Sequence, residues 1–503
     1  MRHTLLPIAF VALALCLGAA LVASALLALG WFVADARIGD AQKELDAAQA
    51  TAEARSTLIA DLQAQVATQQ RELDDLRSRL TSTPTPGPLS TPSVTPTPPS
   101  PRATPTPPPT ITPALDVSLM DSIQRQVSAL RGLAPRRPVE RAIMTAAELR
   151  EYITRKLNED YPKEEARSDL ITLLAFGLLD SEMDLHGFYV DLYSEQIAGF
   201  YDSDAKKLYV ISDLAQFGPL ERTTFAHEYG HALQDQHFDL EGLGIDDERD
   251  SQRAAAIRAL AEGDALLIMQ QYMQRYFSPQ DLAGLLEQLG AADQSTLENA
   301  PRVFQEELQF PYVYGLQFVQ EFYNEGGWEA VNRVWADPPV STEQIMHPER
   351  YRADDAPQPV TLPPLTDTLG TGWRLMDEDS LGEFLLRVVL EGQIDSEEAS
   401  AAAEGWGGDR YAVYYQEAQA QTVLALRTVW DTAAEATEFV GAYTRYAQAR
   451  FSGQAGEQRP GQRCWRGSVS SQCLLFRSNQ ALVVLGPTMD VINAVLARFP
   501  DFR

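Results

Sequence analysis

A 33-residue segment near the N-terminus separates a small N-terminal part of this chain of 503 residues from a larger globular part. Residues 81–113 consist almost entirely of Thr, Pro and Ser. Such a composition supplies too little apolar surface for a core, and its prolines favour an extended polyproline II chain. At roughly 3.1 Å per residue, the segment could span up to about 100 Å. The sequence therefore predicts a stiff linker between a small N-terminal part and a larger globular part.

The N-terminal part begins with a long uncharged stretch. Residues 5–33 are rich in Leu, Ala and Val and carry no charged side chain. As a helix they would measure about 43 Å, more than the roughly 30 Å of a bilayer core. A cleavable signal has an apolar region of only about 7–15 residues, so we predict an uncleaved transmembrane anchor within residues 1–36. Arg2 precedes it, which places the N-terminus in the cytoplasm and the globular part outside the cell membrane.

Between anchor and linker, residues 37–80 show an apolar repeat. Leu, Ile, Val and Ala recur at alternating steps of three and four, with interruptions at Arg55 and Gln69. This spacing is typical of a coiled-coil stalk. A parallel homodimer of two copies is one interpretation, and a single polar helix or an intramolecular hairpin is the other.

The charge of the chain limits its partners. The formal net charge is −29, while 45% of the residues are hydrophobic, which is ample for a core. Nucleic acids and anionic membrane surfaces attract basic patches. The sequence therefore argues against nucleic acid as a partner, and its contact with the membrane is expected through the anchor alone.

In the globular part, two histidines are spaced by one helical turn. Residues 225–233 contain His-Glu-x-x-His flanked by apolar and helix-forming residues. On a helix, positions i and i+4 share a face, so His227 and His231 can direct two imidazoles at one cation, which suits Zn²⁺. Glu228 follows the first histidine, where its carboxylate can take a proton from water at the metal. We predict Glu228 as the general base.

A catalytic zinc site needs three protein ligands and one open position, so a third ligand must come from elsewhere. Glu262 lies on a helix predicted over about residues 251–276. A Glu ligand from a following, antiparallel helix is the arrangement of the gluzincin metallopeptidases. His237 has the spacing of the metzincins instead, but that pattern needs Gly at position 234, where this chain has Gln234. A straight helix would carry His237 about 15 Å from His227. This geometry favours Glu262, with His237 as the alternative.

The two residues after Glu262 also carry information. Gly263 in mid-helix costs up to ~1 kcal/mol relative to Ala, which indicates close packing, for instance against the helix of His227. Asp264 could orient a ligand histidine, but on a straight helix it points to another side than Glu262. Only the closeness of Asp264 to Glu262 in the sequence supports that role.

The remaining patterns predict an α+β fold. Residues 197–201 and 207–211 are β-rich and flank a turn, which predicts a hairpin just before the helix of His227. The edge of such a strand can accept an extended peptide. Thr145 and Glu148 form a capping box that opens a helix. We therefore expect a mainly helical domain over residues 114–364 and a C-terminal α+β domain over residues 365–503, with a disulfide between Cys464 and Cys473.

Several segments together resemble a family of uncharacterised bacterial zincin-like proteins, which are similar to gluzincin metallopeptidases. The resemblance rests on residues 195–238, 262–265, 339–348 and 405–411, and it covers roughly residues 131–430. It implies zinc at His227, His231 and Glu262, with Glu228 as the base. It implies no particular substrate.

A hydrolytic zinc site also uses a donor that steadies the oxyanion. Tyr312, Tyr314 and His347 are candidates, although aromatic residues at this spacing are more often part of a core. The sequence as a whole predicts a membrane-anchored, extracytoplasmic zinc metallopeptidase that acts on a peptide or protein. The alternative is a surface-displayed binding or scaffold protein with a degenerate, non-catalytic zincin head.

Overall fold

The structure of the chain is a computed structural model that describes residues 11–14, 117–212, 217–247, 250–451 and 455–502. The predicted coiled coil, the predicted linker and most of the predicted anchor lie outside the described residues. Within the described ranges, no helix combines the length and the apolar character needed to cross a bilayer. Four residues of the predicted anchor, Val11–Ala14, form strand β1.

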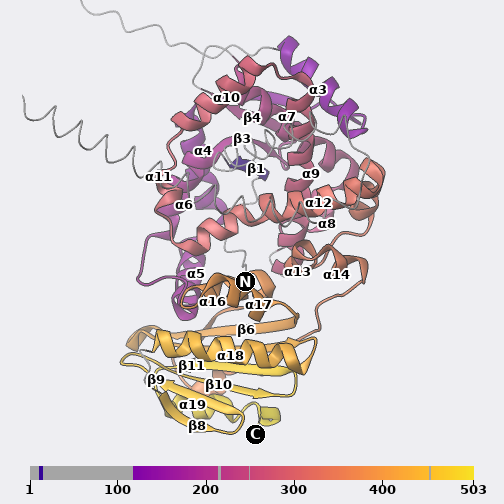
Figure 1. Ribbon diagram of the computed structural model, residues 1–503. Helices are drawn as coiled ribbons and strands as arrows, with labels where there is room; N and C mark the ends of the chain where they lie inside the picture. Colours follow the sequence, from indigo (N-terminus) through magenta and orange to yellow (C-terminus); the bar gives the residue numbers. More distant parts are fainter. Residues whose placement is uncertain (1–10, 15–116, 213–216, 248–249, 452–454, 503) are drawn as a thin grey trace, which may run out of the picture. The chain divides into compact units, whose positions relative to one another are not determined.

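Residues 117–352 are mainly helical (Figure 1). The predicted capping box is confirmed, because the Thr145 hydroxyl accepts from the backbone of Glu148 and helix α4 begins at Ala146. Gly326 and Gly327 leave helical geometry and kink α12. The helices of this region are α3 (Val117–Arg131), α4 (Ala146–Asp160), α5 (Lys163–Phe176), α6 (Leu185–Gln196), α7 (Pro219–Phe238), α8 (Leu240–Leu243), α9 (Ser251–Tyr276), α10 (Pro279–Ala291), α11 (Ser295–Glu298), α12 (Arg302–Ala336), α13 (Thr342–Met346) and α14 (Pro348–Arg352).

A small mixed sheet lies among these helices. The predicted hairpin is confirmed as β3 (Ile197–Asp202) and β4 (Lys207–Ile211), which pair antiparallel. Strand β2 (Glu140–Met144) pairs parallel with β4, and β1 pairs antiparallel with the other edge of β3. The strand order is therefore β1-β3-β4-β2. The edge of β3 that the sequence offered to a peptide is taken by β1 in this structure.

Close helix crossings fix α9 against its two neighbours. A Cβ at Gly230 of α7 would lie 3.1 Å from Ile268 of α9, so the two helices pack tightly there. A Cβ at Gly263 would collide with the backbone of Gly315 in α12, and one at Gly315 would collide with Ala259. The expectation of close packing at Gly263 is confirmed, but its partner is α12 rather than α7, because Gly230 supplies the contact with α7.

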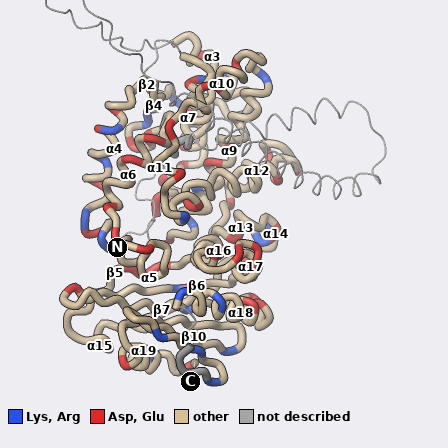
Figure 2. Tube along the Cα trace, turned by 60° about the vertical axis from the view of Figure 1, so that its left-hand side comes forward, with Lys and Arg blue, Asp and Glu red and all other residues tan. Residues whose placement is uncertain are grey.

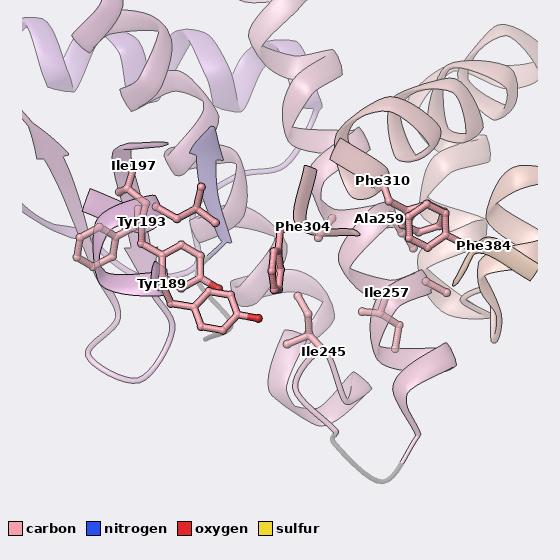
Figure 3. Close-up of a cluster of buried hydrophobic side chains, with 14 of the residues drawn as sticks. Tyr189, Tyr193, Ile197, Ile245, Ile257, Ala259, Phe304, Phe310 and Phe384 are labelled. Atoms are coloured by element: carbon pink, nitrogen blue, oxygen red, sulfur yellow. The ribbon is translucent and has the colours of Figure 1, made fainter. Parts of the chain in front are cut away.

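Aromatic side chains fill the core between these helices and the next region (Figure 3). Tyr189 of α6 meets Phe304 of α12 edge to face, with ring centroids 5.7 Å apart. Phe310 of α12 packs on Phe384, whose ring centroid is 4.4 Å away. Phe384 belongs to the first long helix of the C-terminal region, so the hydrophobic core continues from one region into the other.

The C-terminal region is an antiparallel sheet with helices on both faces. Its strand order is β5-β6-β7-β11-β10-β9-β8. Residues alternate between the two faces, as Leu424 and Leu426 of β7 join one core cluster while Val423 and Ala425 join another. The elements are α15 (Thr366–Leu369), β5 (Trp373–Asp379), α16 (Gly382–Glu391), α17 (Ser396–Ala403), β6 (Trp406–Gln416), β7 (Gln421–Trp430), α18 (Ala433–Arg450), β8 (Ala455–Arg459), β9 (Gln462–Arg466), β10 (Ser471–Arg477), β11 (Gln480–Gly486) and α19 (Met489–Leu496).

A disulfide in the C-terminal region was predicted from the sequence. The Cys464–Cys473 disulfide is present and joins paired positions of β9 and β10, so that prediction is confirmed. Basic and acidic residues are interspersed in both regions in the view of Figure 2.

The helices and strands of the two regions confirm an α+β fold, with a helical region that holds a small mixed sheet and a C-terminal antiparallel sheet.

Candidate metal centre

Helix α7 carries the two predicted histidines as a continuous helix from Pro219 to Phe238. Glu221 caps its first turn through the backbone N–H of Gly218, and Pro219 occupies the first helical position, which suits the fixed φ of proline. His227 and His231 lie one turn apart, are fully buried, and have their ring centroids 4.6 Å apart. The local spacing thus gives the convergence that the sequence predicted.

Glu262 of α9 completes a three-residue group. Its Oε2 atom lies 3.1 Å from Nε2 of His227 and 3.5 Å from Nε2 of His231, and the two Nε2 atoms are 2.9 Å apart. Only 2% of the Glu262 surface is exposed. This His227–His231–Glu262 triad could hold a metal ion, and in the part of the chain that the structure describes it is the only such group of three or more His, Cys, Asp or Glu.

The dimensions of the triad fit zinc. Ligand atoms at about 2.0–2.1 Å from a tetrahedral zinc ion are about 3.3 Å from one another. The three separations, 2.9, 3.1 and 3.5 Å, scatter around that value. Two imidazole nitrogens and one carboxylate oxygen are also a donor set that catalytic zinc sites use. A single ion could therefore contact all three atoms without a rearrangement of the helices.

The protonation states also suit a cation. Burial lowers the pKa of His227, which favours the neutral imidazole that a metal needs. Burial alone would raise the pKa of Glu262, but the charges and hydrogen bonds of His231 and His227 outweigh it, and the pKa lies below its ordinary value. The triad therefore holds a carboxylate next to a neutral ring, rather than a neutral acid.

Glu228, the predicted base, is fully buried on α7 beside strand β3. A Cβ placed on Gly199 would lie 3.5 Å from Cγ of Glu228 and would collide with Thr224 and with the carbonyl of Tyr209. Glycine at position 199 therefore lets β3 approach α7 at the level of the predicted base. Strand β1, which pairs with the edge of β3 opposite to β4, passes this point.

Gln234 is a residue whose role the sequence did not predict. Its Oε1 atom lies 2.9 Å from Nδ1 of His231, and its Nε2 donates to the carbonyl of Ala261 at 2.9 Å. It is fully buried. The signal that could have revealed it is its spacing, three residues after His231 on the same helix face.

Asp264 does not contact either histidine. It accepts hydrogen bonds from Nε of Arg131 at 2.9 Å and from Nη2 at 2.8 Å, and a third from Nε1 of Trp335 at 2.7 Å. Arg131 also lies over the ring of Trp328, 4.3 Å from its centroid. Asp264 therefore joins α3, α9 and α12, and orienting a ligand histidine is not its role.

The other sequence candidates contact different parts of the molecule. His237 bonds to the carbonyl of Ala134 at 2.8 Å, at the end of the same unbroken helix, and is not part of the triad. His347 pairs with Glu383 at 2.8 Å. Tyr312 packs with Leu266 and Met269, and Tyr314 lies against Phe310. A role in oxyanion stabilisation for His347, Tyr312 or Tyr314 stays a prediction.

Comparison with known proteins identifies one region only. A family model described as "Domain of unknown function (DUF8575)" matches residues 372–496, from β5 to α19. No curated protein matches the chain, and no solved structure does. The helical region that holds the triad lies outside the matched residues.

Proposed function

We propose that this chain is a zinc metallopeptidase of the gluzincin type, held on the outer side of a cell membrane by its N-terminal segment. The observation that carries the proposal is the buried convergence of His227, His231 and Glu262 within 3.5 Å. Glu228 supports it, because a purely structural metal needs no acid beside its ligand. Structural zinc sites are also commonly closed by cysteines, whereas Cys464 and Cys473 are joined to each other.

The residues of the chain divide the chemistry among them. Two imidazoles and a carboxylate would hold the ion, which when bound supplies a Lewis acid and lowers the pKa of a coordinated water to about 7. The Glu228 carboxylate accepts a proton from the water that attacks the peptide carbonyl, and then delivers it to the leaving amine. Strand β3 offers its edge to the substrate as an extended chain, with Gly199 allowing close approach to Glu228.

A second candidate function follows from the closure of the site. His227, Glu228 and His231 are fully buried, and β1 occupies the edge of β3 and contacts α7 and α9. A metal in such a place could serve only to join two helices in a surface-displayed binding or scaffold protein. Under the peptidase proposal, β1 must leave that edge before a substrate can enter.

Zinc content and peptide hydrolysis, measured on the full-length chain in detergent, separate the two functions. We expect one zinc per chain and cleavage of an unstructured protein substrate. Glu228→Gln should keep the zinc and lose activity by about 10²–10⁴-fold, the usual contribution of a general base. Glu241→Gln removes the same charge from an exposed position of α8 and should change neither quantity.

Three outcomes would contradict the proposal in different ways. A wild-type chain that binds no zinc would refute the metal centre. Full activity in Glu228→Gln would refute the assigned base. Stoichiometric zinc without hydrolysis of any peptide tested would favour the binding or scaffold function.

A further inference from the structure

One side chain links the second histidine of the triad to the helix of the third residue. Gln234 of α7 reaches the imidazole of His231 with its oxygen and the backbone of α9 with its nitrogen. The carbonyl that it contacts belongs to Ala261, the residue immediately before Glu262. Gln234 therefore touches both components that must be held in place if the triad is to bind one ion.

The chemistry of the amide fixes the direction of both hydrogen bonds. The carbonyl of Ala261 can only accept, so the amide nitrogen of Gln234 must face it. The amide oxygen then faces His231 and can only accept, which requires the proton of that ring to be on Nδ1. The Nε2 atom of His231 is left with its lone pair directed at His227 and Glu262, from which it lies 2.9 and 3.5 Å away.

The two histidines differ in this respect. Nδ1 of His227 has no hydrogen-bond partner among the described residues, whereas Nδ1 of His231 has Gln234. A ligating histidine usually donates its other ring N–H to an acceptor, which fixes both the tautomer and the ring orientation. His231 is therefore the ligand whose state is fixed before a metal arrives.

We propose that Gln234 is the positioning residue of this metal centre, because it holds His231 in the tautomer that binds metal and ties that ring to the backbone beside Glu262. The inference rests on the proposed metal centre. It also gives a physical reason for glutamine at a position where a sharp turn of the chain would need glycine: the side chain here serves the second ligand, and α7 continues without a break to Phe238.

The experiment measures zinc affinity by competition with a chelator on the full-length chain. Gln234→Met keeps the length of the side chain and removes both polar atoms. Gln236→Met is the matched control, because Gln236 lies two residues further on the same helix, is also buried, and also uses its amide to bind backbone, accepting from Arg136 and Arg137. Urea unfolding of each metal-free variant measures the general cost of losing a buried amide.

We expect Gln234→Met to weaken zinc binding by about 10–100-fold, the usual effect of removing a partner of a ligating histidine. Gln236→Met should lose comparable stability and bind zinc as the wild type does. Gln234→Glu keeps an acceptor for Nδ1 of His231, loses the donor to Ala261 and adds a buried negative charge beside that carbonyl. Its zinc affinity should fall less than that of Gln234→Met.

The results that would overturn the inference are distinct from those that concern the metal centre. Unchanged zinc affinity in Gln234→Met, or an equal loss in Gln236→Met, would show that Gln234 does not position the ligands. If Gln234→Met does not fold, a loss of 100-fold or more in Gln234→Glu would show that the acceptor for Nδ1 is not what matters. A wild-type chain without zinc affinity would overturn both proposals together, whereas zinc-bound wild type with an unaffected Gln234→Met would leave the metal centre standing.

Discussion

The helical region and the C-terminal sheet both bury a carboxylate, but they surround it differently. Asp409 at the start of β6 accepts from the backbone N–H groups of Leu381 and Gly382 and from Nε1 of Trp406, each at 2.8 or 2.9 Å. Glu262 instead faces two imidazoles. Burial raises the pKa of Asp409 to about 6, whereas contact with the histidines lowers the pKa of Glu262.

The contrast distinguishes an acid that serves the fold from one that is available for chemistry. The backbone N–H groups of Leu381 and Gly382 that meet at the Asp409 carboxylate fix the start of helix α16, and any ligand there would have to displace them. The partners of Glu262 are the imidazole side chains of His227 and His231, whose lone pairs a cation can bind without breaking any backbone hydrogen bond. In the run from Gly405 to Tyr411, which the sequence resemblance included, Trp406 and Asp409 thus have a role in the structure of the sheet.

The largest effect expected on zinc affinity separates these two acids directly. Glu262→Gln removes a charged ligand, and we expect zinc affinity to fall on the order of 10²–10³-fold, about one ligand's share of a typical zinc binding energy. Asp409→Asn should leave zinc affinity unchanged and lower the free energy of unfolding by about 1–3 kcal/mol, because its backbone donors lose an acceptor. Chelator competition and urea unfolding give the two quantities. The comparison fails if Asp409→Asn loses zinc as strongly as Glu262→Gln does.

The next effect tests the support of the triad. Asp264→Ala leaves Arg131 buried without its partner, and both side chains of this pair are fully buried. We expect the helical region to lose about 3–5 kcal/mol of unfolding free energy. Hydrogen exchange with mass spectrometry locates the change: peptides from α3, α9 and α12 should lose protection while peptides from β6, β7 and β11 keep it. Uniform loss over both regions would show that they unfold as one unit.

A smaller effect is expected from the disulfide of the sheet. Replacing Cys464 and Cys473 by serine opens a short loop, since the two residues are 9 positions apart. Loop entropy predicts a loss of about 2–3 kcal/mol, with no change in zinc affinity. Thermal unfolding under oxidising conditions measures the loss, and the same measurement with reductant should bring the wild type close to the variant. Weaker zinc binding in the double variant would show coupling between the regions.

The smallest effect concerns a surface ion pair of the helical region. Arg150 and Asp191 form this pair, with about half of each side chain exposed. Asp191→Ala should therefore lower the unfolding free energy by less than about 1 kcal/mol. The substitution removes the same chemical group as Asp264→Ala and differs in the burial of the site. If both variants lost the same unfolding free energy, burial would not explain the contribution of Asp264 to stability.

Local patterns predicted what local forces determine. The spacing of His227 and His231, the capping box at Thr145 and the β3–β4 hairpin all follow from residues close in sequence, and the structure confirms them. The rejection of His237 was also local, because it depended on whether α7 stays straight beyond His231. Glu262, 35 positions from His227, was instead selected by the arrangement of the gluzincins.

Contacts between distant segments could not be predicted in this way. Arg131 and Asp264 are 133 positions apart, and no periodicity connects them. Strand β2 is short and pairs parallel with β4, so its place depends on a crossover that its own residues do not encode. The Gln234 bond needed the position of the Ala261 carbonyl, which is known only once α7 and α9 are packed.

The crossing of α9 and α12 at Gly263 and Gly315 has a consequence for the whole centre. Backbone lies directly on backbone there, so no side chain can be lengthened or shortened to adjust the spacing. A single methyl group at position 263 would collide with the backbone of Gly315, so α9 and α12 would have to move apart directly beside Glu262. The glycine pair therefore sets the distance between α9 and α12. The position of Glu262, the third ligand, thus depends on a helix that contributes no ligand itself.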